Sequence, residues 1–343
     1  MKQDKMKAVG LFKYLPIDDR ESLIDAEIDK PIPTGKDLLV KVKAISVNPV
    51  DTKVRSPKDT TEKQLKILGW DVAGIVEQVG QDSTMFKPGD EVFYAGSITR
   101  PGGNSEYHLV DERIVGHKPD SLDFANAAAL PLTAITAWEA LFDRLGIHSD
   151  PSKNKGKNIL IIGAAGGVGS IATQLAKQAG LSVIATASRK ESTDWVKQLG
   201  ADYVINHYEA FSPQLLHNGV KEVDFILCLN STEKHWNNMA EAIAPQGKIC
   251  SIVETDENLN LTLLKNKSVT FVWELMFTRS TYQTEDMVEQ HRLLNEIARL
   301  VDSGIIQTTV SEKIAPINAV NLRKAHAILE SGRTVGKVVL EDF

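Results

Sequence analysis

The chain has 343 residues, of which 42% are hydrophobic and 24% charged, and this length is sufficient for two domains with a core each. The formal net charge of -6 and the scattered Lys and Arg residues argue against a nucleic-acid-binding protein. The first residues lack the apolar segment of a signal peptide, and no apolar run is long enough to cross a bilayer. We therefore predict a cytoplasmic protein that does not enter the membrane.

The first predicted domain covers residues 1–127. Short β-type runs alternate there with turn residues, which is typical of a mostly antiparallel, barrel-like unit. These runs cover residues 7–12, 37–47, 71–80, 87–96 and 105–110.

The second predicted domain covers residues 128–278, where strands alternate with helical segments. The predicted strands cover residues 158–163, 181–187, 203–206, 223–230, 247–253 and 268–277. This alternation predicts an α/β fold with a doubly wound parallel sheet and helices on both faces. Cys228 and Cys250 lie inside apolar runs, so we expect buried thiols and not a disulfide or a metal site.

The C-terminal segment, residues 279–343, contains two helical patterns and a closing strand that begins near Lys337. A six-stranded sheet has no position for this segment. We therefore expect it to return to the first domain.

A glycine-rich turn follows the first strand of the second domain, in the sequence NILIIGAAGGVGSIATQLAKQ that begins at Asn158. The apolar run predicts a buried strand and the following spacing predicts a helix, so the turn offers helix N–H groups to a pyrophosphate. Gly166 would allow the phosphate to approach, and Gly169 would allow the helix to pack closely on the strand. Ala164 stands where the usual motif has its first glycine. The predicted cofactor contacts in this turn are Gly163, Ala165, Gly166, Gly167, Val168 and Gly169. The alternative is a turn whose glycines only permit tight packing.

The end of the next strand predicts the type of dinucleotide. An NAD site usually has an acidic residue there, whereas this chain has Ser188, Arg189 and Lys190. A hydroxyl and two cations suit a 2′-phosphate, so we predict NADP(H). The alternative is that both cations belong to a solvated helix start.

The domain order and three motifs resemble the medium-chain dehydrogenase/reductase superfamily over essentially the full length. GAAGGVGSIATQLAK, SVNPVDTKVR and LPLTAITAWEAL are most similar to its zinc-free quinone oxidoreductase branch, which includes zeta-crystallin. The resemblance implies a GroES-like catalytic domain combined with a Rossmann domain.

Zinc-containing members of this superfamily hold a catalytic metal with Cys and His ligands. By resemblance the first Cys falls at Asn48, the His at Trp70 and a later ligand near Pro131. These side chains are poor ligands or none, so we predict no metal site. Without a Lewis acid, reduction of a quinone or an enone is easier than oxidation of an alcohol.

The resemblance also indicates the site residues. Asn48 would face the nicotinamide and the substrate and donate to a developing oxyanion, although it could instead hold the turn before Pro49. Asp51 would orient this loop. Lys53 replaces a tyrosine that is common in the branch, and it would either polarise the substrate carbonyl or be a solvated charge.

Further predicted cofactor contacts are Thr133, Asn230, Val253 and Lys337. Trp70, Trp273 and Phe277 are candidates for the wall of an acceptor pocket, or for core packing.

We therefore predict an NADPH-dependent, zinc-independent reductase of quinones or enones. The apolar final strand, Ser268–Phe277, would form a sheet edge that pairs with a second subunit, so we predict a homodimer. Two alternatives remain open, namely a non-catalytic NADPH-binding sensor or structural protein, and a zinc alcohol dehydrogenase with unusual ligands.

Overall fold

The structure is a computed structural model, describes residues 4–343 and contains two compact units. The first unit contains the chain up to Leu132 together with Phe277–Phe343, and the second contains Thr133–Met276. Within the described part of the chain, no helix is both long and apolar enough to cross a membrane.

The second unit contains one six-stranded parallel sheet. Its strands lie in the order β11-β10-β9-β12-β13-β14, so the direction of winding reverses between β9 and β12. This arrangement confirms the predicted doubly wound fold. The strands are β9 (Asn158–Ile162), β10 (Ser182–Thr186), β11 (Tyr203–Ile205), β12 (Val223–Cys228), β13 (Ile243–Ser251) and β14 (Thr270–Trp273).

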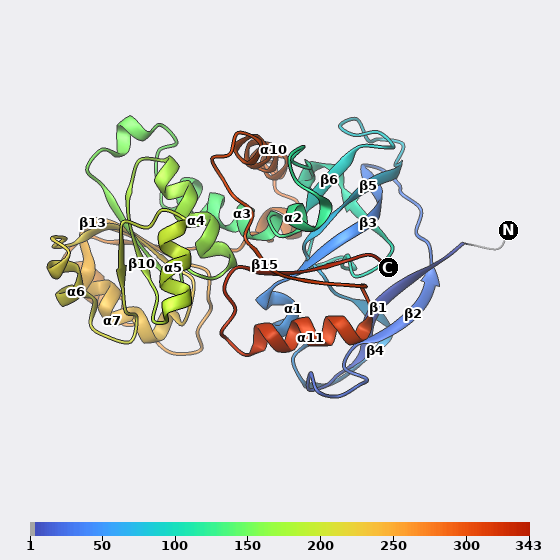
Figure 1. The fold of residues 1–343 in the computed structure, drawn as a ribbon, viewed down its shortest axis with the longest axis horizontal. Helices are drawn as coiled ribbons and strands as arrows, with labels where there is room; N and C mark the ends of the chain where they lie inside the picture. Colours follow the sequence, from blue (N-terminus) through green and yellow to red (C-terminus); the bar gives the residue numbers. More distant parts are fainter. Residues whose placement is uncertain (1–3) are drawn as a thin grey trace. The chain divides into compact units, whose positions relative to one another are not determined.

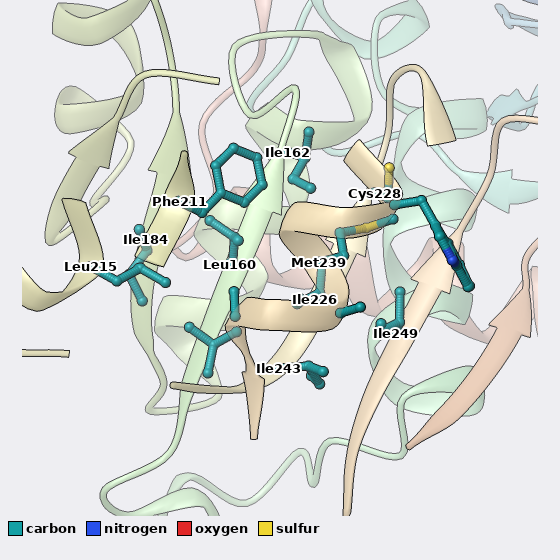
Figure 2. Packing of buried hydrophobic residues seen from close by; sticks show 14 of the residues in the cluster. Leu160, Ile162, Ile184, Phe211, Leu215, Ile226, Cys228, Met239, Ile243 and Ile249 are labelled. Atoms are coloured by element: carbon teal, nitrogen blue, oxygen red, sulfur yellow. The ribbon is translucent and has the colours of Figure 1, made fainter. Parts of the chain in front are cut away.

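Helices cover both faces of this sheet. They are α4 (Gly167–Gln178), α5 (Lys190–Gln198), α6 (Phe211–His217), α7 (Thr232–Ala242) and the short α8 (Thr262–Lys265). Helices α4 and α5 lie side by side (Figure 1), and the Trp195 indole donates to Ser170 Oγ between them at 2.8 Å. The core on the face of α6 and α7 contains Leu160, Ile226, Phe211 and Met239 (Figure 2). Because strand side chains alternate, the buried neighbours Ile159 and Ile161 face α4.

The two cysteines of this unit are free and fully buried. Cys228 is part of the same apolar core (Figure 2). Burial raises the pKa of Cys228 to about 11 and also raises that of Cys250. Both therefore behave as small hydrophobic residues, as the sequence predicts.

The first unit contains two further sheets. The smaller has the order β2-β1-β4, and the larger has the order β15-β16-β3-β5-β6-β8, with β7 paired to β3. The strands are β1 (Lys5–Tyr14), β2 (Ile24–Asp29), β3 (Asp37–Val47), β4 (Lys58–Ile67), β5 (Val72–Val79), β6 (Glu91–Tyr94), β7 (Tyr107–Asp111), β8 (Gly116–His117), β15 (Val310–Ile314) and β16 (Lys337–Glu341). All these pairs are antiparallel except β15 with β16.

The C-terminal strand is built into this larger sheet. Strand β16 pairs with β3, with Val338 opposite Val47, which places the start of β16 beside the loop after β3. Helices of this unit are α1 (Pro49–Arg55), α2 (Phe124–Ala128), α9 (Thr278–Tyr282), α10 (Glu289–Asp302) and α11 (Ala319–Glu330). Helix α3 (Pro131–Trp138) begins at the end of the unit's first segment and continues as a π-helical turn, Glu139–Arg144.

Candidate functional site

A buried polar cluster lies where β3 ends, β5 begins and β16 begins. Asn48, Asp71 and Lys337 supply its side chains and are 1%, 0% and 4% exposed. The Asn48 Nδ2 donates to Asp71 Oδ2 at 2.8 Å, and the Lys337 ammonium donates to Asn48 Oδ1 and, at 2.9 Å, to Asp71 Oδ2. The pairing of β16 with β3 therefore brings together residues 289 positions apart in the chain.

The Lys337 ammonium is fully hydrogen-bonded within this cluster. Its third bond goes to the Val47 carbonyl at 3.2 Å. An ammonium has three donors, so Lys337 has none left for a bound molecule in this arrangement. The direct contact to the cofactor that we predicted for Lys337 would require one of these bonds to break.

Asp71 anchors the cluster from two sides. Besides Asn48 and Lys337, its Oδ1 accepts from the Leu132 backbone N at 2.7 Å, in the first turn of α3. Burial raises the pKa of Asp71, and the Lys337 ammonium and the bonds from Asn48 and Leu132 act against this. Sequence reasoning assigned Asp71 no role, because one acidic residue before a strand gives no local signal.

Asp51 holds the loop around Asn48. It is fully buried, and its two oxygens accept from the backbone N–H groups of Asn48 at 2.7 Å and Gly69 at 3.0 Å. Burial raises the pKa of Asp51 to about 7, and these bonds together with Lys337 limit the rise. Both oxygens of Asp51 therefore accept bonds from backbone N–H groups of the segments around Asn48 and Gly69.

The structure leaves Lys53 out of this buried cluster. Lys53 lies on α1, two residues after Asp51, and is exposed.

Trp70 and Phe277 are buried and pack edge to face, with ring centroids 6.1 Å apart, whereas Trp273 on β14 is 48% exposed. Trp70 and Phe277 thus have the core-packing role that was the alternative to a pocket wall.

The positions that would carry zinc ligands do not suit a metal. Trp70 donates its indole N–H to the Ser97 carbonyl at 3.2 Å, Pro131 has no donor atom in its side chain, and the Asn48 oxygen accepts from an ammonium. Among residues 4–343, no three His, Cys, Asp or Glu side chains gather in a way that could hold a metal ion.

The glycine turn of the second unit has the geometry of a phosphate-binding loop. Gly163 has a φ of +82° and its N–H donates to Thr186 Oγ1 at 3.0 Å. A Cβ at Gly169 would lie 2.5 Å from Ala164 Cα, so only glycine permits this approach of α4 to the end of β9. At Gly166 the nearest atom would be 3.5 Å away, which leaves its face open. These features fit a pyrophosphate at the N-terminus of α4, next to Ala165, Gly167 and Val168.

Other predicted cofactor residues gather at the same edge of the sheet. Asn230 follows β12, and its Cβ would lie 3.5 Å from a Cβ on Gly163. Val253 follows β13, and its carbonyl accepts from Thr232 Oγ1 at 2.6 Å. Carboxyl ends of parallel strands beside a reversal of winding are where α/β proteins bind ligands. Thr133 is buried in α3 and has no such position on the sheet.

The polar residues after β10 are exposed. Ser188, Arg189 and Lys190 follow shortly after the strand, and Arg189 is the N-cap residue of helix α5. Lys190 pairs with Asp194 one turn along this helix. An exposed pair of this spacing is worth only about 0.3–0.5 kcal/mol, so Lys190 can exchange it for a phosphate.

Comparisons with known proteins agree with this architecture. An alcohol dehydrogenase GroES-like domain matches residues 34–120, and a zinc-binding dehydrogenase family matches residues 199–340. A zinc-type alcohol dehydrogenase-like protein of Staphylococcus epidermidis is 44% identical, over 98% of this chain and 99% of the relative.

Two solved structures are similar over nearly the whole chain. A protein from Rhizobium etli CFN 42, described as a zinc-dependent alcohol dehydrogenase, is 53% identical with a TM-score of 0.94, covering 99% of both chains. The Escherichia coli quinone oxidoreductase, solved in complex with NADPH, is 26% identical with a TM-score of 0.79, covering 98% of this chain and 99% of the other.

Proposed function

The chain belongs to the medium-chain dehydrogenase/reductase superfamily of oxidoreductases, and on this premise we propose that it is a zinc-independent NADPH-dependent reductase of quinones or α,β-unsaturated carbonyls. One observation carries the proposal. At the positions of the zinc ligands, the chain has Trp70, Pro131 and an Asn48 amide held by a buried ammonium. These side chains do not suit a metal ion, but the Asn48 amide can donate a hydrogen bond to an oxygen.

One set of residues would hold the cofactor, and another would stabilise the acceptor. NADPH, when bound, supplies the hydride. The turn at Gly163–Gly169 and the α4 N-terminus would hold its pyrophosphate, with Asn230 and Val253 at the same edge of the sheet. Asn48 would donate from Nδ2 to the acceptor oxygen as negative charge develops there. Asp51 holds the loop that carries Asn48. The proton that completes the reduction would come from water or a nearby side chain.

NADPH oxidation against quinones, enones and simple aldehydes, with a chelator present, tests this function. We expect chelator-resistant turnover of a quinone or an enone. Saturable NADPH binding without turnover of any acceptor would indicate the sensor, and one zinc per chain with chelator-sensitive alcohol oxidation would indicate the zinc enzyme.

Arg189 should determine the preference for NADPH. A charge-assisted bond to the 2′-phosphate is worth about 1.5–3 kcal/mol, so we expect the wild type to bind NADPH at least tenfold more tightly than NADH. Arg189→Ala should lose most of this difference by weakening NADPH and leaving NADH unchanged. Fluorescence titration of both nucleotides measures it, with Arg292→Ala, an exposed arginine of the other unit, as control. Equal affinities in the wild type would contradict the prediction.

We also propose a homodimer formed at β14. This strand ends the order of the sheet, and the exposed side chains of Trp273 and Leu275, 48% and 59% exposed, lie on it or just after it. A second copy would satisfy the edge and cover both side chains. Sedimentation equilibrium should show a dimer that Trp273→Lys weakens and that Tyr208→Lys, at an exposed aromatic residue elsewhere in the unit, does not. A wild type that is monomeric at all concentrations would refute the dimer.

A further inference from the structure

The buried cluster fixes the orientation of the Asn48 amide. Lys337 can only donate, so the side-chain oxygen of Asn48 must face it, and the Nδ2 group then faces Asp71. An Asn side chain held in this way cannot flip without losing both bonds. Nδ2 carries two hydrogens, and the bond to Asp71 uses one of them.

We infer that Lys337 and Asp71 are positioning residues, which fix and polarise the Asn48 amide so that its second Nδ2 hydrogen is offered to the acceptor oxygen. The inference rests on the proposed function and adds to it two residues that act only through Asn48. Neither touches the substrate, because the three donors of Lys337 are occupied and both oxygens of Asp71 accept bonds from the protein.

The two charges have different effects on the amide. The ammonium on Oδ1 withdraws electron density from the amide and strengthens Nδ2 as a donor, because hydrogen bonds in a low-dielectric site polarise one another. The carboxylate of Asp71 fixes the direction of Nδ2. Its charge would oppose the polarisation if it were alone, but Lys337 also bonds to Asp71 Oδ2 and offsets this charge.

A mutant cycle between Lys337 and Asn48 tests the inference. In the wild-type background, Lys337→Met should lower kcat by about tenfold or more, which is less than the 10²–10³ expected when the oxyanion donor itself is removed, because Asn48 is still present. The Kd for NADPH should stay within about twofold, since Lys337 has no donor left for the cofactor. In the Asn48→Ala background, Lys337→Met should lower kcat by no more than about twofold, because residues that act as one unit are not additive.

Folding is controlled separately. Lys337→Met leaves Asp71 buried without its cation, which destabilises a protein, so the double variant Lys337→Met/Asp71→Asn keeps the cluster neutral and should show the same loss of kcat. Lys118→Met is the matched control. Lys118 is a buried lysine of the same unit, 8% exposed, which donates to the carbonyls of Pro119 and Leu122 at 2.9 and 2.6 Å. Its loss should lower the melting temperature and leave kcat unchanged.

Three results would overturn the inference. The first is an equal loss of kcat from Lys337→Met with and without Asn48. The second is a raised Kd for NADPH with normal kcat, which would mean that Lys337 contacts the cofactor. The third is an unchanged NMR chemical shift of the Asn48 side-chain amide between the wild type and Lys337→Met/Asp71→Asn. This amide signal is assigned by its absence from the spectrum of Asn48→Ala. Failure of the proposed function is distinct, because it would appear as a wild type without turnover, and the NMR comparison still decides the inference.

Discussion

Asn48→Ala is expected to reduce kcat for a quinone or an enone by about a hundredfold to a thousandfold, with little change in the Kd for NADPH. The Asn48 amide has one hydrogen still to donate, whereas the three donors of Lys337 are occupied and the oxygens of Asp71 and Asp51 accept bonds from the protein. Removing one donor that stabilises a developing oxyanion costs an enzyme about 10²–10³ in kcat. Single-turnover oxidation of NADPH measures this step apart from product release.

Asn154→Ala is the matched control for Asn48→Ala. Asn154 is also buried, at 2% exposed, and its Nδ2 donates to the carbonyls of His148 and Ala179 at 2.6 and 2.8 Å. Its loss should lower the melting temperature without lowering kcat, since it lies in the other unit and far along the chain from the cluster. If Asn48→Ala kept kcat within threefold of the wild type, Asn48 would only hold the turn before Pro49, which is the alternative role considered for this residue.

The parallel sheet could be predicted from the sequence because its strands are buried on both faces. Strands such as β9 and β12 are continuous apolar runs between turn residues, and all six were predicted. Strand β4, with the sequence KDTTEKQLKI, was missed because it is mostly exposed and polar, and its position depends on pairing with β1. Strand β2 likewise pairs only with β1 and shows no buried face.

The candidate site was predicted only in part, for a related reason. Resemblance indicated Asn48 and Lys337, and the glycine spacing indicated the turn before α4. Neither indicated that Lys337 bonds to Asn48 and Asp71, because the contact depends on the register of β16 against β3. The exposure of Lys53 and the burial of Trp70 were also not predicted, because a short motif does not show burial.

His326 should make the protein sensitive to acid. The side chain lies in α11, is fully buried, and neither ring nitrogen has a hydrogen-bond partner among the described residues. Burial lowers the pKa of His326 to about 3, and the nearby Arg55 guanidinium adds to this effect. The unfolded chain, with a pKa near 6.5, binds a proton that the folded protein does not between about pH 6.5 and pH 3. Protonation of His326 therefore leaves the free energy of unfolding unaffected above about pH 6.5, and lowers it progressively as the pH falls from 6.5 toward 3.

His326→Leu is expected to stabilise the protein, and to do so more strongly in acid. At pH 8 the gain should be about 1–3 kcal/mol, because an apolar side chain replaces a buried polar ring without partners. At pH 5 the gain should be larger by about 2 kcal/mol, the free energy of a proton bound only by the unfolded chain at 1.5 pH units below its pKa. Urea unfolding of the variant and the wild type at both pH values measures the difference directly. Other groups, such as Asp51, whose raised pKa contributes with the opposite sign, cancel in this comparison.

His108→Leu provides the contrasting control, because His108 is equally a buried histidine but a fully bonded one. Its Nδ1 lies 3.0 Å from the Tyr94 hydroxyl and its Nε2 2.9 Å from the Pro101 carbonyl, and burial lowers its pKa to about 4. Substitution leaves both partners buried and unpaired, so the variant should lose about 1–3 kcal/mol at pH 8, the opposite sign to His326→Leu. If His326→Leu also lost stability at pH 8, and by the same amount at pH 5, a buried water would have to bond the imidazole of His326. Burial alone would then not set the pKa of that ring.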